Sequence, residues 1–203
     1  MTTSYRIDVH TAAGIKTAEI TDFYALGYSK RVNAPGLCEV ILEGNHRDLN
    51  TFERNGQIII YRSFDNGVSW DADYYGLHQF EKRYTTKEGT DIFVSRSPGI
   101  LNMLYSRENL WYANTTNRTA FSSVKAETVM KNLVKYNATS LATTGNGRLR
   151  NGQITGISVE TDSASGNTIS INNAQDNLLE TLQKIAQVSG GDFDLVKTGA
   201  QSF

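Results

Sequence analysis

Apolar and polar residues alternate along most of the first half of the chain. Tyr5, Ile7 and Val9 alternate with Arg6, Asp8 and His10, and this period of two is typical of a half-buried strand. Ile58-Ile59-Ile60 is a run of three β-branched residues, which predicts a strand buried on both faces. Further strands are predicted over residues 18–26, 37–42, 72–84 and 90–95.

Turn residues separate these strands. Asn33-Ala34-Pro35-Gly36 combines a Pro that fixes φ with a Gly that supplies a positive φ. Asp65-Asn66-Gly67 is a hairpin signal, Lys87-Glu88-Gly89 predicts another turn, and Gly76 predicts a bulge or bend. Short strands at this spacing predict a sandwich or barrel, and a closed barrel leaves no free edge.

The second half contains two helical patterns, over residues 124–136 and 174–188. Their one-sided apolar stripes predict helices that pack on a sheet or on each other. The stripes consist of Ala126, Val129, Met130, Leu133 and Val134 in the first and Leu178, Leu179, Leu182, Ile185 and Ala186 in the second.

The residues beside these helices predict where each begins and ends. Ser122 or Ser123 is the expected N-cap of the first helix, and Asn137 its left-handed C-terminal residue. Asn172 or Asn173 is the expected N-cap of the second helix, and Gly190 its stop.

Less regular segments surround the helices. A short helical turn is predicted from Ile100 to Tyr105, and a boundary within the polar residues 109–120. Gly145-Asn146-Gly147 predicts a flexible turn, followed by strands over 153–161 and 168–171. Gly191 to Val196 resembles the start of a new strand, so we expect this chain to be the N-terminal part of a longer protein.

Composition narrows the class of partner. The net charge is −1, whereas a basic patch is the usual footprint of phosphate binding. The chain has no run of eighteen apolar residues, so no membrane-spanning segment is expected. Basic residues near aromatic ones are a feature of oligonucleotide-binding barrels. Here the acidic residues balance the charge of the basic ones, which argues against this interpretation. These basic residues are Arg6, Lys16, Lys30, Arg31, Lys82, Arg83 and Arg96.

The residues that could carry chemistry form no catalytic pattern, and we predict no catalytic, cofactor-binding or metal site. Cys38 is the only cysteine, and its strand position predicts a small apolar filler. His10, His46 and His78 have no metal-ligand spacing and are expected at the surface or half-exposed. A Ser-His-Asp triad is defined by geometry and stays open, although no G-x-S-x-G elbow is present.

Three acids near one turn raise the question of a calcium loop. Asp65, Asp71 and Asp73 straddle apolar residues, and no Glu closes the loop as a bidentate ligand would. We therefore interpret this segment as a solvated hairpin tip.

The order of elements resembles a known family. The resemblance is carried by the strands Tyr5 to Val9, Pro35 to Leu42 and Asn55 to Ile60, and by the helices Glu127 to Val134 and Leu178 to Ala186. In this order they resemble the N-terminal region of bacteriophage tail hub proteins of the siphovirus Gp37-like type, relatives of baseplate hub and tail-associated proteins.

The resemblance implies a mainly β fold with packed helices (α+β), built from two related β-barrel hub domains. Residues 1–108 would form the first barrel, 109–139 a linker with a helix, and 140–203 the start of a second, incomplete barrel. The implied role is a homotrimeric hub at the tail tip or baseplate of the virion, made in the host cytoplasm, that lets DNA pass. The implied partners are the distal tail protein or tail tube ring, the tape measure protein, and fibre or spike proteins.

The interior of such a ring would suit neutral or acidic walls, because these repel phosphates. Asp8, Glu19, Glu39 and Glu81 lie at outward-facing strand positions and are candidates to line it. Two alternatives belong to other functional classes. One is a cell-wall-degrading enzyme, and the other is a carbohydrate-binding β-domain in which Trp70 and Trp111 stack on sugar.

Overall fold

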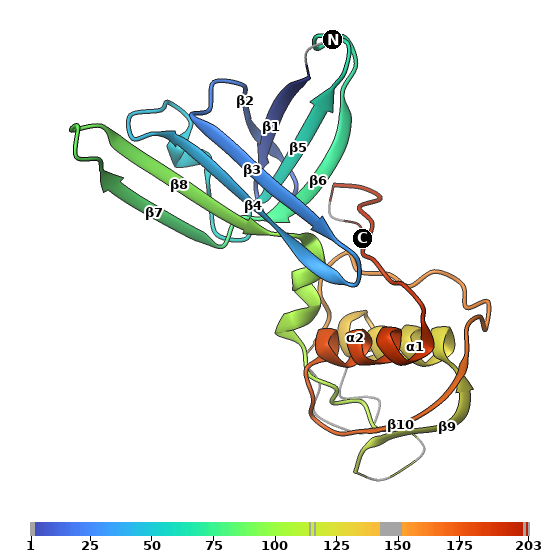
Figure 1. Ribbon diagram of the computed structural model, residues 1–203. Helices are drawn as coiled ribbons and strands as arrows, with labels where there is room; N and C mark the ends of the chain where they lie inside the picture. The colour runs from blue at the N-terminus through green and yellow to red at the C-terminus, as the bar shows by residue number, and fades with distance from the viewer. Residues whose placement is uncertain (1–2, 114, 116, 143–151, 201, 203) are drawn as a thin grey trace. The chain divides into compact units, whose positions relative to one another are not determined.

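The chain forms two compact units in the computed structural model, which describes residues 3–113, 115, 117–142, 152–200 and 202 (Figure 1). Unit 1 consists of Met1–Arg31 and Pro35–Ile100, and unit 2 of Val32–Ala34 and Leu101–Phe203. Strands dominate unit 1, and the two long helices belong to unit 2. The mainly β class with helices that the sequence predicted is confirmed.

Unit 1 is built from two four-stranded antiparallel sheets. One sheet has the strand order β2-β1-β5-β6 and the other β3-β4-β8-β7 (Figure 1). The strands are β1 (Ser4–His10), β2 (Lys16–Ile20), β3 (Ala25–Arg31), β4 (Ala34–Glu43), β5 (Gln57–Ser63), β6 (Asp71–Leu77), β7 (Phe80–Thr85) and β8 (Asp91–Pro98). A short 3-10 helix, η1 (Leu49–Thr51), connects β4 to β5.

The inward positions of both sheets form the core of unit 1. Ile7 and Val9 on β1 lie opposite Ile60 and Ile58 on β5, and all four are fully buried. The facing sheet contributes further buried side chains to the same cluster, among them Val40, Leu42 and Phe93. Ile59 points to the other face, yet it is only 2% exposed. The prediction that this isoleucine run is buried on both faces is therefore confirmed.

The two sheets of unit 1 are not closed into a barrel within the described residues. Sequence alternation could not decide this, because a sandwich and a barrel share the same inside–outside pattern. Near one end, an isolated bridge joins Gly76 to Gly99. A Cβ on Gly76 would lie 3.1 Å from the carbonyl oxygen of Pro98, so this glycine permits a close approach of backbones. The predicted bulge lies elsewhere, between Ile60 and Tyr61.

The turns of unit 1 largely follow their residues. Asn66 and Gly67 both have positive φ in the predicted hairpin, and so does Gly89 in the turn between β7 and β8. The predicted turn at residues 33–36, which connects β3 to β4, differs, because Asn33, a residue of unit 2, takes the positive φ (57°) while Gly36 lies within β4. There a Cβ on Gly36 would lie 1.8 Å from the carbonyl oxygen of Ser29.

Unit 2 combines two helices with one small sheet. Strands β9 (Thr119–Lys125) and β10 (Thr168–Asn173) pair antiparallel, and helices α1 (Ala126–Ala138) and α2 (Leu178–Ser189) pack against each other (Figure 1). The 3-10 helix η2 (Ile100–Ser106) confirms the predicted helical turn. Strand 168–171 is confirmed as part of β10.

The helix boundaries correct several predicted caps. Ser122 and Ser123 lie in β9, because its pairing with β10 continues to Lys125, so neither caps α1. Asn137 does not end α1 in a left-handed conformation but lies inside it. The cap of α2 is Asn177, whose side chain accepts a hydrogen bond from the backbone N–H of Glu180, rather than Asn172 or Asn173.

Gly190 ends α2 as predicted. Its φ is 70°, and its N–H donates to the carbonyl of Ala186. The predicted strand over 153–161 is wrong, because Ile154 and Ile157 bury their side chains from a turn, in which the Ile157 N–H donates to the Ile154 carbonyl. The predicted turn at residues 145–147 lies outside the described residues.

The expected start of a strand at residues 191–196 stays a prediction, because this segment has no strand pairing within the described residues. It is held by one side chain of its own unit instead. Asn33 accepts a hydrogen bond from the N–H of Phe193 and donates to the carboxylate of Asp192. The carbonyl of Asn33 also accepts a hydrogen bond from Gln183 on α2.

Buried asparagine side chains replace regular pairing in the polar loop of unit 2. The amide oxygen of Asn137 accepts hydrogen bonds from the backbone N–H groups of Leu110 and Trp111, and its amide nitrogen donates to the Leu133 carbonyl. Asn109, also fully buried, donates to Thr181 on α2. The bonds of Asn137 satisfy backbone groups that a sheet ladder would otherwise pair, and the bond of Asn109 joins the loop to α2.

Replacing Gly36 by alanine should destabilise unit 1 by about 2 kcal/mol or more, because the new methyl group meets backbone atoms that cannot rotate away. The matched control is Gly27→Ala on β3, where a Cβ meets nothing within 4 Å; its effect should stay within about 0.5 kcal/mol. Urea unfolding followed by Trp70 fluorescence, in chains carrying Trp111→Phe, measures both. Equal effects of the two substitutions would contradict the close β3–β4 approach.

Replacing Asn137 by alanine should destabilise unit 2 by about 1–3 kcal/mol, because the Trp111 N–H loses its acceptor, whereas the Leu110 N–H keeps the Glu108 carbonyl at 3.0 Å. The control is Asn132→Ala on the same helix, half-buried, for which we expect about 1 kcal/mol or less. Urea unfolding followed by Trp111 fluorescence, in chains carrying Trp70→Phe, compares them. A tolerated Asn137→Ala would show that this amide does not hold the loop.

Candidate functional site

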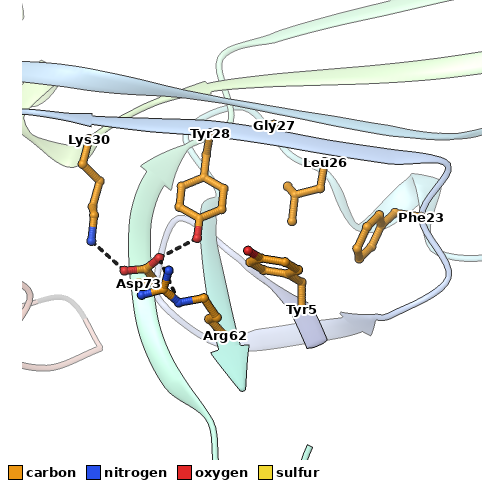
Figure 2. A pocket seen from close by; sticks show the side chains of 8 residues that line it. All are labelled: Tyr5, Phe23, Leu26, Gly27, Tyr28, Lys30, Arg62 and Asp73. Atoms are coloured by element: carbon orange, nitrogen blue, oxygen red, sulfur yellow. Dashed lines mark hydrogen bonds and ion pairs between the residues drawn. The ribbon is translucent and has the colours of Figure 1, made fainter. Parts of the chain in front are cut away.

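A pocket of about 710 Å³ opens in unit 1 between strand β3 and the facing sheet (Figure 2). Strand β3 contributes Leu26, Tyr28 and Lys30 at alternate positions, so their side chains point to the same side. Gly27 of β3 also lines the pocket, and the other lining residues come from β1, β5, β6 and the loop before β3. The full lining consists of Tyr5, Phe23, Leu26, Gly27, Tyr28, Lys30, Arg62 and Asp73.

One end of the pocket is organised around the carboxylate of Asp73. The hydroxyl of Tyr28 donates a hydrogen bond of 2.5 Å to it, and the ammonium of Lys30 one of 2.6 Å (Figure 2). Arg62 adds an ion pair at 3.6 Å. The Asp73 side chain is only 11% exposed. Two hydrogen-bond donors of β3 and one cation of β5 therefore converge on one shielded carboxylate of β6.

These contacts fix the protonation states at the charged end. Burial by itself raises the pKa of Asp73, but the hydrogen bonds from Lys30 and Tyr28 and the charges of Lys30 and Arg62 outweigh it, so that the pKa is lowered. Burial and the hydrogen bond to Asp73 raise the pKa of Tyr28. At neutral pH the carboxyl is ionised and the phenol neutral. This arrangement suits binding and orientation rather than proton transfer.

The other end of the pocket is aromatic and apolar. Tyr5 and Tyr28 meet edge to face with ring centroids 6.3 Å apart, and Tyr28 also contacts Tyr74 behind it at 5.7 Å. Figure 2 shows Leu26 and Phe23 beyond Tyr5, away from Asp73. The pocket thus has an apolar end and a charged end, both arranged along β3.

In the part of the chain that the structure describes, no three His, Cys, Asp or Glu residues lie close enough together to bind a metal ion. Asp65 uses its carboxylate to accept hydrogen bonds from the N–H groups of Val68 and Ser69, which confirms a hairpin tip. Asp73 serves the pocket, so the acids considered as a calcium loop do not converge.

Cys38 and the three histidines differ in how deeply the fold buries them. Cys38 is fully buried, and burial raises the pKa of its thiol to about 12, which confirms an inert filler. His10 and His46 are half-buried, as expected. His78 is buried, contrary to expectation, because it hydrogen-bonds Ser95 and packs edge-on against Phe52. Burial lowers the pKa of His78.

The four acids considered for a pore lining all have cationic neighbours. Asp8, which was expected at an outward-facing position, is instead buried, with Arg6 at 3.1 Å and Lys16 at 2.9 Å. The other three ion pairs lie at the surface: Glu19 with Lys16 at 2.6 Å, Glu39 with Arg96 at 2.6 Å and Glu81 with Arg83 at 3.7 Å. These acids therefore present balanced rather than bare negative charge. Their place in a pore stays a prediction.

The basic residues near aromatics have contacts of their own. Lys30 bonds Asp73, Lys82 lies over the Tyr84 ring and Arg83 over the Phe93 ring. Arg6, Lys16 and Arg96 form ion pairs with carboxylates. Most of the cations that suggested an oligonucleotide-binding barrel are therefore paired with a carboxylate or lie over an aromatic ring.

The two tryptophans considered for sugar stacking each have a ring contact within their own unit. Arg6 lies over the ring of Trp70, 5.1 Å from its centroid. Trp111 stacks on Tyr136 at 4.2 Å with an interplanar angle of 20°. Packing inside unit 2 thus accounts for Trp111.

The sequence did not predict the pocket, because nothing in it indicated that all of these residues would lie together. Asp73 was grouped with the hairpin tip and Lys30 with scattered cations. The available signal was alternation: Leu26, Tyr28 and Lys30 share one face of a strand. Nothing in the sequence showed that β6 would bring Asp73 to that face.

Comparisons with known proteins identify the fold. No family model and no curated protein matches the chain. Among solved structures, it is similar to a tail protein from Neisseria meningitidis, with a TM-score of 0.51, 8% identity and 91% of this chain covered. It is also similar to a prophage tail protein from Listeria monocytogenes, with a TM-score of 0.50, 14% identity and 92% covered.

The chain spans less than half of these proteins, 45% and 46% of their respective lengths. At such low identity the similarity establishes the fold alone. The resemblance to phage tail proteins that the sequence indicated is confirmed at that level.

Replacing Asp73 by asparagine should lower the free energy of unfolding of unit 1 at pH 7 by about 1–3 kcal/mol, because it leaves Lys30 and Arg62 without their anion. The folded pKa is lowered, so the carboxylate stabilises the chain above its unfolded pKa of about 3.9. That stabilisation is lost as the pH falls through the folded value.

Urea unfolding between about pH 7 and pH 2 tests this expectation, since the difference between wild type and Asp73→Asn should shrink with acidification. Asp71→Asn, an exposed site on the same strand, is the control and should behave as wild type. A difference that stays constant with pH would contradict the ionised bridge.

Proposed function

We propose that this protein is a structural component of a phage tail tip, a hub that oligomerises around the tail axis. It joins the tail tube to distal fibre or spike parts and lets DNA pass. The observation that carries this proposal is the match of the fold to two tail proteins over nine-tenths of the chain. A fold by itself does not determine function, so the role requires its own test.

The surface of unit 1 is compatible with a wall along which DNA slides. The net charge of the chain is −1, and Glu19, Glu39 and Glu81 pair with cations at the surface. A wall of balanced charge releases few counterions when DNA passes, so it does not hold the phosphates.

The proposed hub has two barrel-type domains, of which residues 1–108 supply the first. Residues 109–139 would be the linker, and residues 140–203 the start of the second domain. The proposed partners are two further copies of the chain, the distal tail protein or tail tube ring, the tape measure protein, and fibre or spike proteins. The proposed activity is assembly rather than catalysis, and it is located at the virion tail tip or baseplate.

In the part of the chain that the structure describes, no helix has the length and apolar character needed to cross a membrane.

Antibody fragments raised against the chain should decorate the tail of native particles at its distal end in electron micrographs. Fragments pre-absorbed with the purified chain are the control and should leave the tail bare. Light scattering of the longest natural form of the protein should give three times its monomer mass. Label on the head alone, or a monomer that degrades peptidoglycan, would contradict the proposal.

A further inference from the structure

Strand β3 has a free edge beside the pocket. It is the terminal strand in the order β3-β4-β8-β7, so β4 is its one hydrogen-bonded strand neighbour within the described residues. A free edge presents unpaired N–H and C=O groups to which an extended peptide can add.

Among the four edge strands of unit 1, β3 has the longest run of uncharged residues. Ala25 to Ser29 are five consecutive uncharged residues. By contrast, β7 carries Glu81, Lys82 and Arg83 at its centre, and charges of this kind are how natural proteins block strand addition.

The spacing of the pocket along β3 specifies what an added strand must carry. Leu26 lies at the apolar end and Lys30 at the charged end, which places the two ends four residues, or about 13 Å, apart along the strand. An added strand advances by the same distance per residue. Its side chains facing the pocket would therefore be an apolar group opposite Leu26 and a second group four residues away, opposite Lys30.

The charged end favours an anion as that second group. Two cations, Lys30 and Arg62, surround one carboxylate there, which leaves one positive charge in excess. The cations are accessible, with 63% and 36% of their side chains exposed, whereas Asp73 is only 11% exposed. An incoming group therefore meets the ammonium and guanidinium before it meets the carboxylate (Figure 2).

We propose that the pocket and the free edge of β3 together bind an extended peptide segment of a partner protein. The segment pairs with the backbone of β3, places an aromatic or large aliphatic side chain against Tyr5, Phe23 and Leu26, and carries an Asp or Glu four residues away against Lys30 and Arg62. All eight lining residues belong to unit 1. The proposal therefore holds whether or not the protein is a tail hub.

Fluorescence anisotropy with the 203-residue chain tests the proposal. The probe is a labelled peptide of about nine Thr and Ser residues with Phe at one position and Asp four residues later; a second probe has the reverse order, because strands add in either direction. We expect at least one probe to bind, and hydrogen exchange of the β3 amides to slow when it does. Failure of both to bind up to about 1 mM, the weak limit of specific affinity, would overturn the proposal.

Matched changes separate the charge from the backbone pairing. Lys30→Met keeps the aliphatic stem and removes the charge, and should weaken binding about tenfold, the effect expected of one lost charge-assisted contact. Lys82→Met on β7 should leave binding unchanged. In a probe with N-methyl groups at alternate residues, the side chains are unchanged but the methylated amides cannot donate hydrogen bonds. Of the two possible patterns, the one that methylates the amides facing β3 should bind at least tenfold more weakly than the parent probe. Equal binding by the two lysine variants, or by both methylated probes and the parent, would also overturn the proposal.

Discussion

Apolar packing between two separate sheets is the interaction on which unit 1 depends. Isoleucines and valines of one sheet meet Val40, Leu42 and Phe93 of the other in a single buried cluster. No continuous hydrogen-bond ladder joins the sheets within the described residues, so this packing has to hold them together. The consequence is an architecture with real edges, which a closed barrel would not have.

Hydrogen bonds and ion pairs of polar side chains replace, at a few points, the backbone pairing that a continuous ladder would provide. At the pocket, Tyr28 and Lys30 on β3 bind Asp73 on β6, so three side chains connect the two sheets, and Arg62 on β5 adds an ion pair to Asp73 within its own sheet. In unit 2, Asn137 and Asn33 bind loop backbones that have no strand partner. These side-chain contacts are directional, so they fix the positions of the strands and loops that they join. They leave the backbone groups of the strand edges available for pairing, which suits a protein that joins other components.

The sequence predicted the elements well where local patterning decides them. The β1 and β5 strands, the hairpin at Asp65-Asn66-Gly67 and the end of α2 at Gly190 follow from alternation or from one residue's backbone preference. It failed where a distant partner decides. Ser122 and Ser123 are good caps in isolation but belong to β9, because β10, more than forty residues later, pairs with the residues on both sides of them, Phe121 and Val124.

The pocket shows the same limit for function. Alternation places Leu26, Tyr28 and Lys30 on one face of a strand, but only the packing of the two sheets brings Asp73 to them. A carboxylate with no catalytic motif nearby gives no sequence signal, although Asp73 accepts two hydrogen bonds and forms an ion pair with Arg62.

The most direct test is a reconstruction of the native particle by electron cryo-microscopy at a resolution that shows side chains. The account predicts copies of unit 1 arranged about the tail axis, with a strand of another polypeptide along β3 and its side chain in the pocket. A particle whose tail lacks this protein, or copies whose β3 edge faces only solvent, would contradict it.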